Sequence, residues 1–262
     1  MAIDPRHLQQ HLEAVAQAYG LDLTLPAGKV SPARAPAAAP PRIAPPQPRA
    51  PEPAAAVPAA PQPAPLPPEP RAAALAALRQ EVLPCTRCKL CETRRHTVFG
   101  EGNPAARVMF VGEAPGATED QQGRPFVGPS GELLDRILRG AMGLDRSEVY
   151  IANINKCRPP NNREPTPDEV AACLPYLRQQ VALIRPEVIV CLGRVAAQNL
   201  LGSTESAGKL RGRELHYEGI PVVVTWHPSY LLREPSHKRE TWDDIKRVNR
   251  LLGLPEVPPA AG

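Results

Sequence analysis

Four of the six cysteines stand in pairs whose spacing suits a metal site. Cys85 and Cys88 form a C-x2-C pair, and Cys157 and Cys173 lie 16 positions apart in a distant segment. Two thiolates from one loop and two from another segment are what a four-cysteine site needs. Zinc and iron–sulfur clusters both accept four cysteines, so the spacing alone leaves the metal open.

The other two cysteines are weaker candidates. Cys191 falls within an apolar run and is expected in the core. Cys91 lies close enough to the first pair to compete as a ligand, although the C-x2-C pair is favoured. A thioredoxin-type redox pair is disfavoured because Cys85 does not follow a strand-like run. Haem attachment fails because Lys89, and not His, follows Cys88.

Four short motifs in the same part of the chain carry further side chains that could do chemistry. They are Gly-Glu-Ala-Pro-Gly at 112–116, Gly-Arg-Pro-Phe-Val-Gly at 123–128, Asn-Ile-Asn-Lys-Cys-Arg-Pro-Pro at 153–160 and His-Pro-Ser-Tyr-Leu-Leu-Arg at 227–233. The first alone is typical of an ordinary strand-to-loop turn. It lacks the G-x-G-x-x-G pattern and a P-loop lysine, so a nucleotide-phosphate cradle is poorly supported.

Apolar patterns predict the elements that position these motifs. Strands are expected at residues 108–111, 149–152, 188–192 and 222–224, and helices at 133–142, 167–183, 195–201 and 240–252. Thr166 is expected to cap the second of these helices. Continuous β-branched runs between helices indicate an α/β fold with a parallel sheet covered on both faces. Ligands in such sheets bind beyond the carboxyl ends of the strands, where the motifs lie.

Taken together, the cysteine spacings and the four motifs resemble family 4 of the uracil-DNA glycosylase superfamily, over about residues 81–253. The resemblance implies a three-layer α/β/α sandwich around a four-stranded parallel sheet. It also implies a [4Fe–4S] cluster held by Cys85, Cys88, Cys157 and Cys173. The expected activity is that of a DNA-repair hydrolase in base excision repair. Such an enzyme flips uracil out of DNA and hydrolyses its N-glycosidic bond, leaving an abasic site.

The resemblance also assigns site residues. Those matching the uracil pocket are Glu113, Ala114, Phe126, Asn153 and His227, and those matching catalytic positions are Glu113, Glu119 and His227. Leu231 falls where the superfamily inserts a side chain into the DNA stack. Lys209, Arg211 and Arg233 are expected to contact DNA because they belong to clusters of basic residues near these motifs.

The chemistry explains why these residue types are needed. Phe126 offers a ring face for stacking on the base. An Asn side chain at 153 can donate to uracil O4 and accept from N3–H, a pattern that cytosine reverses. Asn155 is a nearby alternative, which the motif disfavours. Cleavage leaves a uracil anion, and His227 can stabilise it by donating a hydrogen bond to O2, even as a neutral imidazole.

The group that positions the attacking water is open. In the best-known branch of the superfamily an Asp directly follows the equivalent of Glu113, but here Ala114 takes that place. Glu113, Glu119, a backbone group or the DNA phosphates must then orient the water. We expect Glu113 to bind in the pocket and stabilise charge, with Glu119 assisting.

Bulk charge does not identify a nucleic-acid binder, because the formal net charge is only +4. Basic residues nevertheless recur beside the cysteines and the His-Pro motif, which favours phosphate contacts and salt-sensitive binding. Alternatives stay open. One is a covalent uracil-DNA-binding relative, although residues 208–213 lack the Lys-Arg-Arg-Ile-His sequence of that branch. Others are a non-catalytic DNA-binding module and a zinc-binding regulatory protein.

Outside the catalytic part, the sequence predicts little globular structure. A short amphipathic helix is expected within residues 1–20, a disordered Pro/Ala-rich linker at 21–75, the glycosylase domain at 76–255 and a disordered tail at 256–262. The N-terminal arm could bind a protein partner. With neither a secretory signal nor an apolar run of membrane-spanning length, a cytoplasmic monomer is expected.

Overall fold

A computed structural model describes residues 68–255 of the chain. Its central feature is a six-stranded sheet with the order β1-β3-β2-β4-β6-β5. The strands are β1 (Glu101–Gly102), β2 (Val108–Gly112), β3 (Tyr150–Asn153), β4 (Val188–Leu192), β5 (Leu215–Tyr217) and β6 (Ile220–Thr225). The pairs β3–β2, β2–β4 and β4–β6 are parallel, and the edge strands β1 and β5 pair antiparallel.

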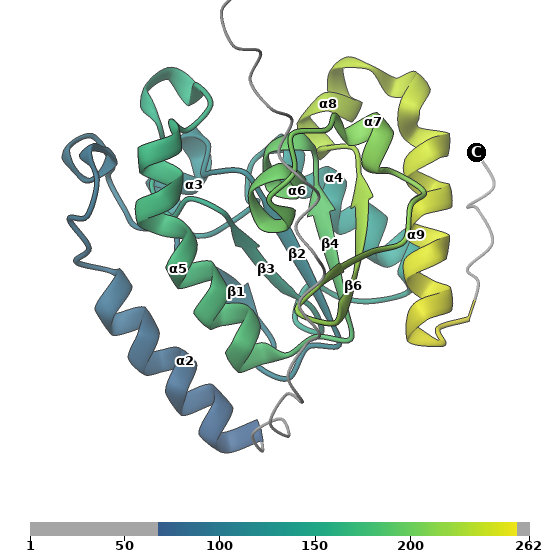
Figure 1. Cartoon of the computed structure of the whole chain (residues 1–262), viewed down its shortest axis with the longest axis horizontal. Helices are drawn as coiled ribbons and strands as arrows, with labels where there is room; N and C mark the ends of the chain where they lie inside the picture. The colour runs from purple at the N-terminus through teal and green to yellow at the C-terminus, as the bar shows by residue number, and fades with distance from the viewer. Residues whose placement is uncertain (1–67, 256–262) are drawn as a thin grey trace, which may run out of the picture. The chain divides into compact units, whose positions relative to one another are not determined.

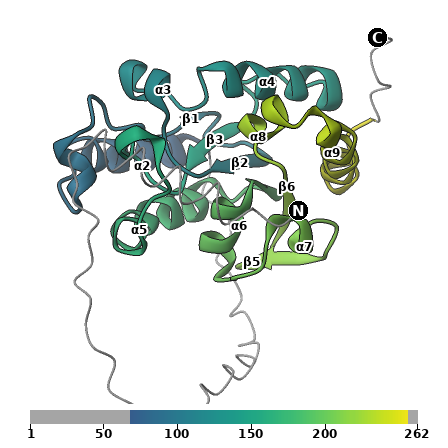
Figure 2. The same ribbon diagram turned by 90° about the horizontal axis from the view of Figure 1, so that it is seen from above.

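Helices cover both faces of this sheet, as Figures 1 and 2 show. On one face lie α2 (Pro68–Val82), α5 (Pro167–Ile184), α6 (Arg194–Leu201) and α7 (Ala207–Leu210). On the other lie α4 (Pro129–Ile137), the π-helix η2 (Leu138–Met142) and α9 (Lys238–Leu252). The remaining elements are η1 (Lys89–Glu92), α3 (Ala117–Gln122), η3 (Pro160–Asn162), α8 (Pro228–Arg233) and η4 (Pro235–His237).

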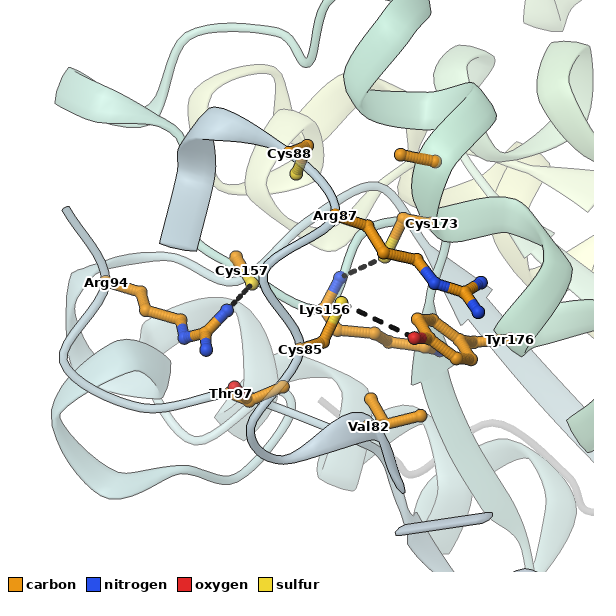
Figure 3. A pocket seen from close by; sticks show the side chains of 11 residues that line it. Val82, Cys85, Arg87, Cys88, Arg94, Thr97, Lys156, Cys157, Cys173 and Tyr176 are labelled. Carbon is orange, nitrogen blue, oxygen red and sulfur yellow. Dashed lines mark hydrogen bonds between the residues drawn. The ribbon is translucent and has the colours of Figure 1, made fainter. Parts of the chain in front are cut away.

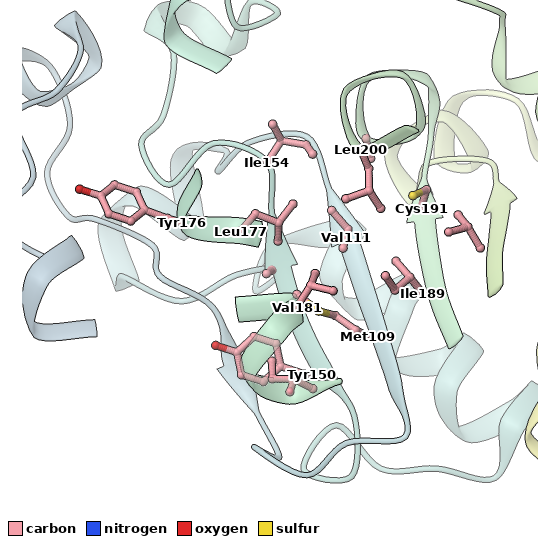
Figure 4. Packing of buried hydrophobic residues seen from close by; sticks show 14 of the residues in the cluster. Met109, Val111, Tyr150, Ile154, Tyr176, Leu177, Val181, Ile189, Cys191 and Leu200 are labelled. Atoms are coloured by element: carbon pink, nitrogen blue, oxygen red, sulfur yellow. The ribbon is translucent and has the colours of Figure 1, made fainter. Parts of the chain in front are cut away.

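Alternate residues of the central strands enter two different cores. Met109 and Val111 of β2 and Ile189 of β4 pack with α5 and α6 in the core drawn in Figure 4. Phe110 of β2 and Val190 of β4 point to the opposite face and pack with α4 and α9. Both faces of these strands are therefore buried, which is why their sequences are continuously apolar and do not alternate with polar residues.

The registers align the carboxyl ends of the four parallel strands. Gly112 of β2 pairs with Asn153 of β3, and Leu192 of β4 pairs with Thr225 of β6. Segments that follow these four residues therefore leave the sheet along one edge. That edge is where a ligand is expected in a parallel sheet.

The α/β class with helices on both faces is confirmed, and the sheet is larger than predicted. The four predicted strands form its parallel centre, and β1 and β5 make it six-stranded. These edge strands span two and three residues, too short for a periodic pattern to be recognised.

Some elements begin or end at residues other than those predicted from the sequence. Helix α2 begins at Pro68, so the last part of the linker predicted at 21–75 is helical. Thr166 opens α5 with a capping box that includes Glu169, as the sequence predicts for the cap. The predicted N-terminal helix, most of the linker and the tail lie outside the described residues. Within residues 68–255, no helix is long and apolar enough to cross a membrane.

Candidate active site

A cavity of about 560 Å³ opens at the carboxyl edge of the parallel strands. Its walls include residues that follow β2, β4 and β6, together with the last residue of β3. All five residues expected in the uracil pocket line it: Glu113, Ala114, Phe126, Asn153 and His227. Glu119 and Arg233 line it as well. The volume lies in the range of small-molecule sites.

Asn153 lines this cavity and carries an unsatisfied, buried acceptor. Its side chain is 2% exposed, and its Oδ1 has no hydrogen-bond partner among the described residues. Leaving a buried acceptor unpaired costs about 1–3 kcal/mol, so this atom is suited to a ligand N–H. Asn155, the alternative in the same motif, does not line the cavity; its Nδ2 donates to the backbone oxygen of Glu169 at 3.0 Å.

Gly112 lets two side chains approach the end of β2. A Cβ atom at this position would stand 2.4 Å from Asn153 Oδ1 and 2.6 Å from Cζ of Phe126. Both distances are far below van der Waals contact. The amide of Asn153 and the ring of Phe126 therefore meet over a backbone that only glycine allows.

Phe126 packs in the cavity wall with an unusual backbone. Its side chain is 5% exposed, and its ring lies 5.6 Å from that of His227, centroid to centroid, at an interplanar angle of 32°. Its φ of 50° lies in the left-handed region that non-glycine residues seldom adopt. Burial alone does not require such a backbone, so other contacts must hold it.

His227 is arranged as a neutral donor. It precedes α8, and its Nδ1 accepts the backbone N–H of Ser229 at 3.1 Å. Since an amide N–H can only donate, Nδ1 carries no proton and the ring proton sits on Nε2. Burial lowers the pKa of His227 to about 4; repulsion from Arg233 adds to this, and attraction by Glu119 opposes it. The ring is therefore neutral at physiological pH.

Glu113 lies at the start of the loop after β2. Burial raises the pKa of its carboxyl, and the charge of Glu164 raises it further, whereas Arg194 lowers it. Arg194 and Glu164 form an ion pair near this residue. Arg194 also lines the cavity and was missed from the sequence, although its position directly after β4 and Gly193 could have marked it.

Glu119 is occupied by backbone contacts. Its Oε1 accepts the N–H groups of Val127 and Gly128, both at 2.9 Å. These are the two residues after Phe126. This oxygen is therefore committed to the loop, and assistance to the attacking water stays a prediction for Glu119.

Leu231, expected where the superfamily inserts a side chain into the DNA stack, is buried in this structure. It is 1% exposed and lines an apolar groove with Leu133 of α4 and Ile245 of α9. The next residue, Leu232, is 43% exposed. Because α8 is helical, packing Leu231 inward turns Leu232 towards solvent.

Of the three basic residues expected to contact DNA, one is engaged within the protein and two are exposed. Arg211 forms ion pairs with Glu240 and Asp244, and its guanidinium lies 5.2 Å from the centre of the Trp226 ring. Its side chain is engaged within the protein, so a phosphate contact by Arg211 would compete with these ion pairs. Lys209 and Arg233 are both exposed and remain suited to DNA.

A second, smaller cavity holds the cysteines. Its walls include all four predicted ligands, Cys85, Cys88, Cys157 and Cys173, as Figure 3 shows. Cys85 and Cys88 follow α2, and Cys173 comes from α5. Cys91 lies outside this wall, in η1, and Cys191 is fully buried in β4, as predicted for a core residue.

The surroundings of these cysteines suit an anionic group. Arg94 Nη1 donates to Cys157 Sγ at 3.1 Å, and the backbone N–H of Lys156 donates to Cys173 Sγ at 3.2 Å (Figure 3). No Asp or Glu stands among the described residues that line the cavity. Burial raises the pKa of the Cys157 thiol to about 11 against the opposing effect of Arg94, so a thiolate here needs further positive charge.

The cysteines are not grouped around one point. Among residues 68–255, no three His, Cys, Asp or Glu side chains stand close enough together to hold a single metal ion. A tetrahedral zinc site would bring its sulfurs to about 3.8 Å from one another, given a Zn–S bond of about 2.3 Å. In an iron–sulfur cluster each thiolate binds a different iron, so the sulfurs stand farther apart. The choice between zinc and an iron–sulfur cluster therefore rests on the sequence resemblance and on iron analysis.

Comparisons with known proteins agree with this geometry. Residues 99–246 match the family model of the uracil DNA glycosylase superfamily. A type-4 uracil-DNA glycosylase of Sulfurisphaera tokodaii is 41% identical over 191 residues, which cover 70% of this chain and 87% of the relative. One of Thermotoga maritima is 44% identical over 186 residues, covering 70% of this chain and 96% of the relative.

A type-5 uracil-DNA glycosylase of Pyrobaculum aerophilum is more distant, at 34% identity over 179 residues, 62% of this chain and 78% of the relative. The residues that match the family model, 99–246, include the sheet and all residues that line the larger cavity. The chain therefore belongs to the uracil-DNA glycosylase superfamily and, within it, to the type-4 family.

Proposed function

We propose that this protein is a DNA-repair hydrolase that removes uracil from DNA by cleaving the bond between the base and the sugar, leaving an abasic site. The type-4 relatives carry this activity in their names. The observation that carries the proposal within this chain is the buried, unpaired Oδ1 of Asn153, which lies beside Phe126 and in the same cavity as His227.

Recognition of the base rests on Asn153. Its Oδ1 would accept the N3–H of a uracil stacked on Phe126, and this bond would satisfy the unpaired acceptor. Cytosine has an unprotonated N3, so the acceptor would face a lone pair and stay unpaired. Sites built to hydrogen-bond a particular group discriminate strongly against analogues that lack it.

Stabilisation of the leaving group rests on His227. As the C1′–N1 bond breaks, its electron pair goes to the base, and negative charge gathers on uracil O2 and O4. The Nε2–H of the neutral ring would donate to O2 and strengthen as the charge develops. Removing one such donor typically costs 10²–10³-fold in rate.

Glu113 is the carboxyl group that we propose to act on the deoxyribose of the flipped nucleotide. Its carboxylate would stabilise the positive charge that develops on the sugar ring and orient the water that attacks C1′. Glu119 has an oxygen committed to two amides, and Ala114 has no polar side chain. Ala114 would instead line the pocket next to the base.

A [4Fe–4S] cluster would be held by Cys85, Cys88, Cys157 and Cys173, which line one cavity with no acidic side chain in its described wall. Four thiolates would give such a cluster a net negative charge, which Arg94 and the buried Lys156 would balance. When bound, the cluster would join the end of α2 to α5 and to the segment that follows Asn153. Its role would therefore be to brace the pocket and the neighbouring DNA surface.

DNA would be bound by the face that carries the cavity mouth. Lys209 and Arg233 would contact phosphates, and Leu232 takes the place expected of Leu231 at the DNA stack. Binding of a protein partner by the N-terminal arm, the monomeric state and the cytoplasmic location stay predictions from the sequence.

Covalent attachment to the deoxyribose would need a second histidine in the cavity, and this disfavours the covalent alternative. Among the described residues that line it, His227 is the sole histidine, and His216 lies exposed on the edge strand β5. The test is to incubate the protein with duplex DNA that contains one uracil, then analyse the free base by mass spectrometry and the DNA on a denaturing gel. Free uracil with multiple turnovers is expected. A protein–DNA adduct that survives denaturation, or binding without release, would contradict the proposal.

A further inference from the structure

The backbone of Phe126 is held on both sides by charged groups. Its left-handed φ of 50° is intrinsically unfavourable for a residue with a Cβ atom, so it must be stabilised by its surroundings. The first turn of α4 packs directly on it, because a Cβ atom at Gly131 would lie 1.8 Å from the backbone oxygen of Phe126. The ring orientation in the cavity follows from this backbone.

Arg146 holds the carbonyl side of the loop. It lies between η2 and β3, and its side chain is 19% exposed. Its Nη1 donates to the backbone oxygen of Phe126 at 3.0 Å, and its Nη2 donates to that of Pro125. One guanidinium thus binds two consecutive carbonyls through two separate nitrogens, whose fixed planar spacing a lysine ammonium does not reproduce.

Two carboxylates fix this guanidinium in place. Glu101 accepts from Nε at 2.6 Å, and Asp135 accepts from Nη1 at 3.1 Å. Burial would raise the pKa of Glu101, but hydrogen bonds from Arg124 and Arg146 outweigh it and hold the pKa below its ordinary value. Arg146 is therefore paired with an ionised partner and has little freedom to rotate.

Glu119 holds the amide side of the same loop. Its Oε1 accepts from the N–H groups of Val127 and Gly128, immediately after Phe126. The two charged residues come from separate segments and contact the loop before and after the ring. Neither contact involves the Phe126 side chain, so both act through the backbone.

We propose that Arg146 and Glu119 are positioning residues that together hold Phe126 in its left-handed conformation and so set the place of its ring under the base. This Phe126 clamp, Arg146 with Glu119, rests on the proposed stacking of uracil on Phe126. It gives Glu119 a task other than activating water. It also adds Arg146, which touches neither base nor sugar, to the residues on which activity depends.

Arg124 provides a matched control for Arg146. Both arginines pair with Glu101, but Arg124 is exposed, and neither of its guanidinium hydrogen bonds goes to the Phe126 loop. The experiment compares Arg146→Lys with Arg124→Lys, after thermal unfolding has established that both are folded. KM and kcat are measured on a uracil-containing duplex, and hydrogen exchange follows the amides of Val127 and Gly128 without substrate.

Arg146→Lys keeps the positive charge but loses the fork. The variant is expected to have a kcat/KM on uracil-containing DNA that is lower than that of the wild type by about tenfold or more. Faster exchange of both amides should accompany this loss. Arg124→Lys should leave kcat/KM and the exchange rates within about twofold of the wild type. If the two variants had the same kcat/KM and the same exchange rates, the proposed clamp would be wrong.

A second pair of variants separates positioning from acid–base work by Glu119. Glu119→Gln keeps an accepting oxygen for the two amides, whereas Glu119→Ala does not. The clamp predicts that Gln retains much more activity than Ala, with the wild-type pH profile. Equal losses in both, with a changed pH profile in Glu119→Gln, would make Glu119 the base instead.

The exchange measurement also separates this proposal from the activity itself. If the wild type released no uracil, the proposed function would fail, yet the amides of Val127 and Gly128 would still be slowed by Arg146 if the clamp is right. If uracil is released and Arg146→Lys changes neither kinetics nor exchange, the function stands and the clamp is wrong.

Discussion

The ammonium of Lys156 donates a hydrogen bond to the backbone oxygen of Asn153 across 2.8 Å. It also donates to Oε1 of Gln180 at 2.6 Å, and the Gln180 amide in turn donates to the backbone oxygen of Phe99. Lys156 is 1% exposed and lines the cysteine cavity, whereas Asn153 lines the uracil cavity. One buried side chain thus connects the two sites.

Replacing Lys156 by Met should therefore affect both sites. The substitution keeps the apolar stem but leaves the oxygens of Asn153 and Gln180 buried without a donor. The expected loss is about 2–4 kcal/mol in the free energy of unfolding, with less iron retained. Denaturant titration and iron analysis of anaerobically purified protein measure the two effects. Lys209→Met, at an exposed position, is the control and should change neither quantity.

Iron content tests the assignment of the four cysteines. Protein purified without oxygen should be brown and contain about four iron atoms per chain, as a [4Fe–4S] cluster requires. Cys157→Ala should lose the colour and the iron, because a ligand is gone. Cys91→Ala should keep both, since Cys91 lies outside the cavity wall. Colourless wild-type protein with bound zinc would contradict the assignment.

The lowered pKa of His227 predicts how stability depends on pH. In the unfolded chain this residue binds a proton near its ordinary pKa of 6.5, but in the fold only near 4. The unfolded state thus binds more protons between these values, and the wild type should lose stability as pH falls from about 6.5 to 4. In His227→Gln that contribution should be absent. Unfolding titrations of both proteins across this range measure the difference.

The same pKa predicts a flat activity profile near neutral pH. Because the ring stays neutral down to about pH 4, the rate of uracil release should show no step at pH 6.5 that arises from His227. His227→Gln should lower the rate by about 10²–10³-fold at all these pH values. A step near 6.5 that the substitution removes would show that the imidazole ionises in its ordinary range.

The two leucines of α8 should have separable effects. Leu231→Ala removes a buried side chain and should cost about 2–5 kcal/mol in the free energy of unfolding. Leu232→Ala should leave stability nearly unchanged but lower the rate on duplex DNA, where a base must be unstacked, more than on single strands. Thermal unfolding and uracil release from both substrates measure these effects. The reverse pattern would restore Leu231 as the residue that enters the stack.

The central strands and the pocket motifs could be predicted because their signals are local. β2 and β4 are buried on both faces, so their sequences are continuous apolar runs, and Asn153 and His227 follow such runs within a few positions. The edge strands β1 and β5 carry too few residues for a period to show.

Other features depend on distant partners. The burial of Leu231 could not be predicted, because the rotational phase of α8 is decided by its packing on α4 and α9. The pairing of Arg211 with Glu240 and Asp244 joins segments far apart in the sequence. Arg146 binds backbone oxygens, which no side-chain motif reveals, and its role follows from the left-handed φ of Phe126.

Uracil release by Asn153→Ala, compared with Asn155→Ala, tests the central claim most directly. The two residues belong to one motif, both have a buried Oδ1 without a described partner, and only Asn153 lines the cavity. Single-turnover release from a uracil-containing duplex should fall by at least about 10²-fold in Asn153→Ala. Asn155→Ala, once shown to be folded, should stay close to the wild type. Undiminished release by Asn153→Ala would contradict the account.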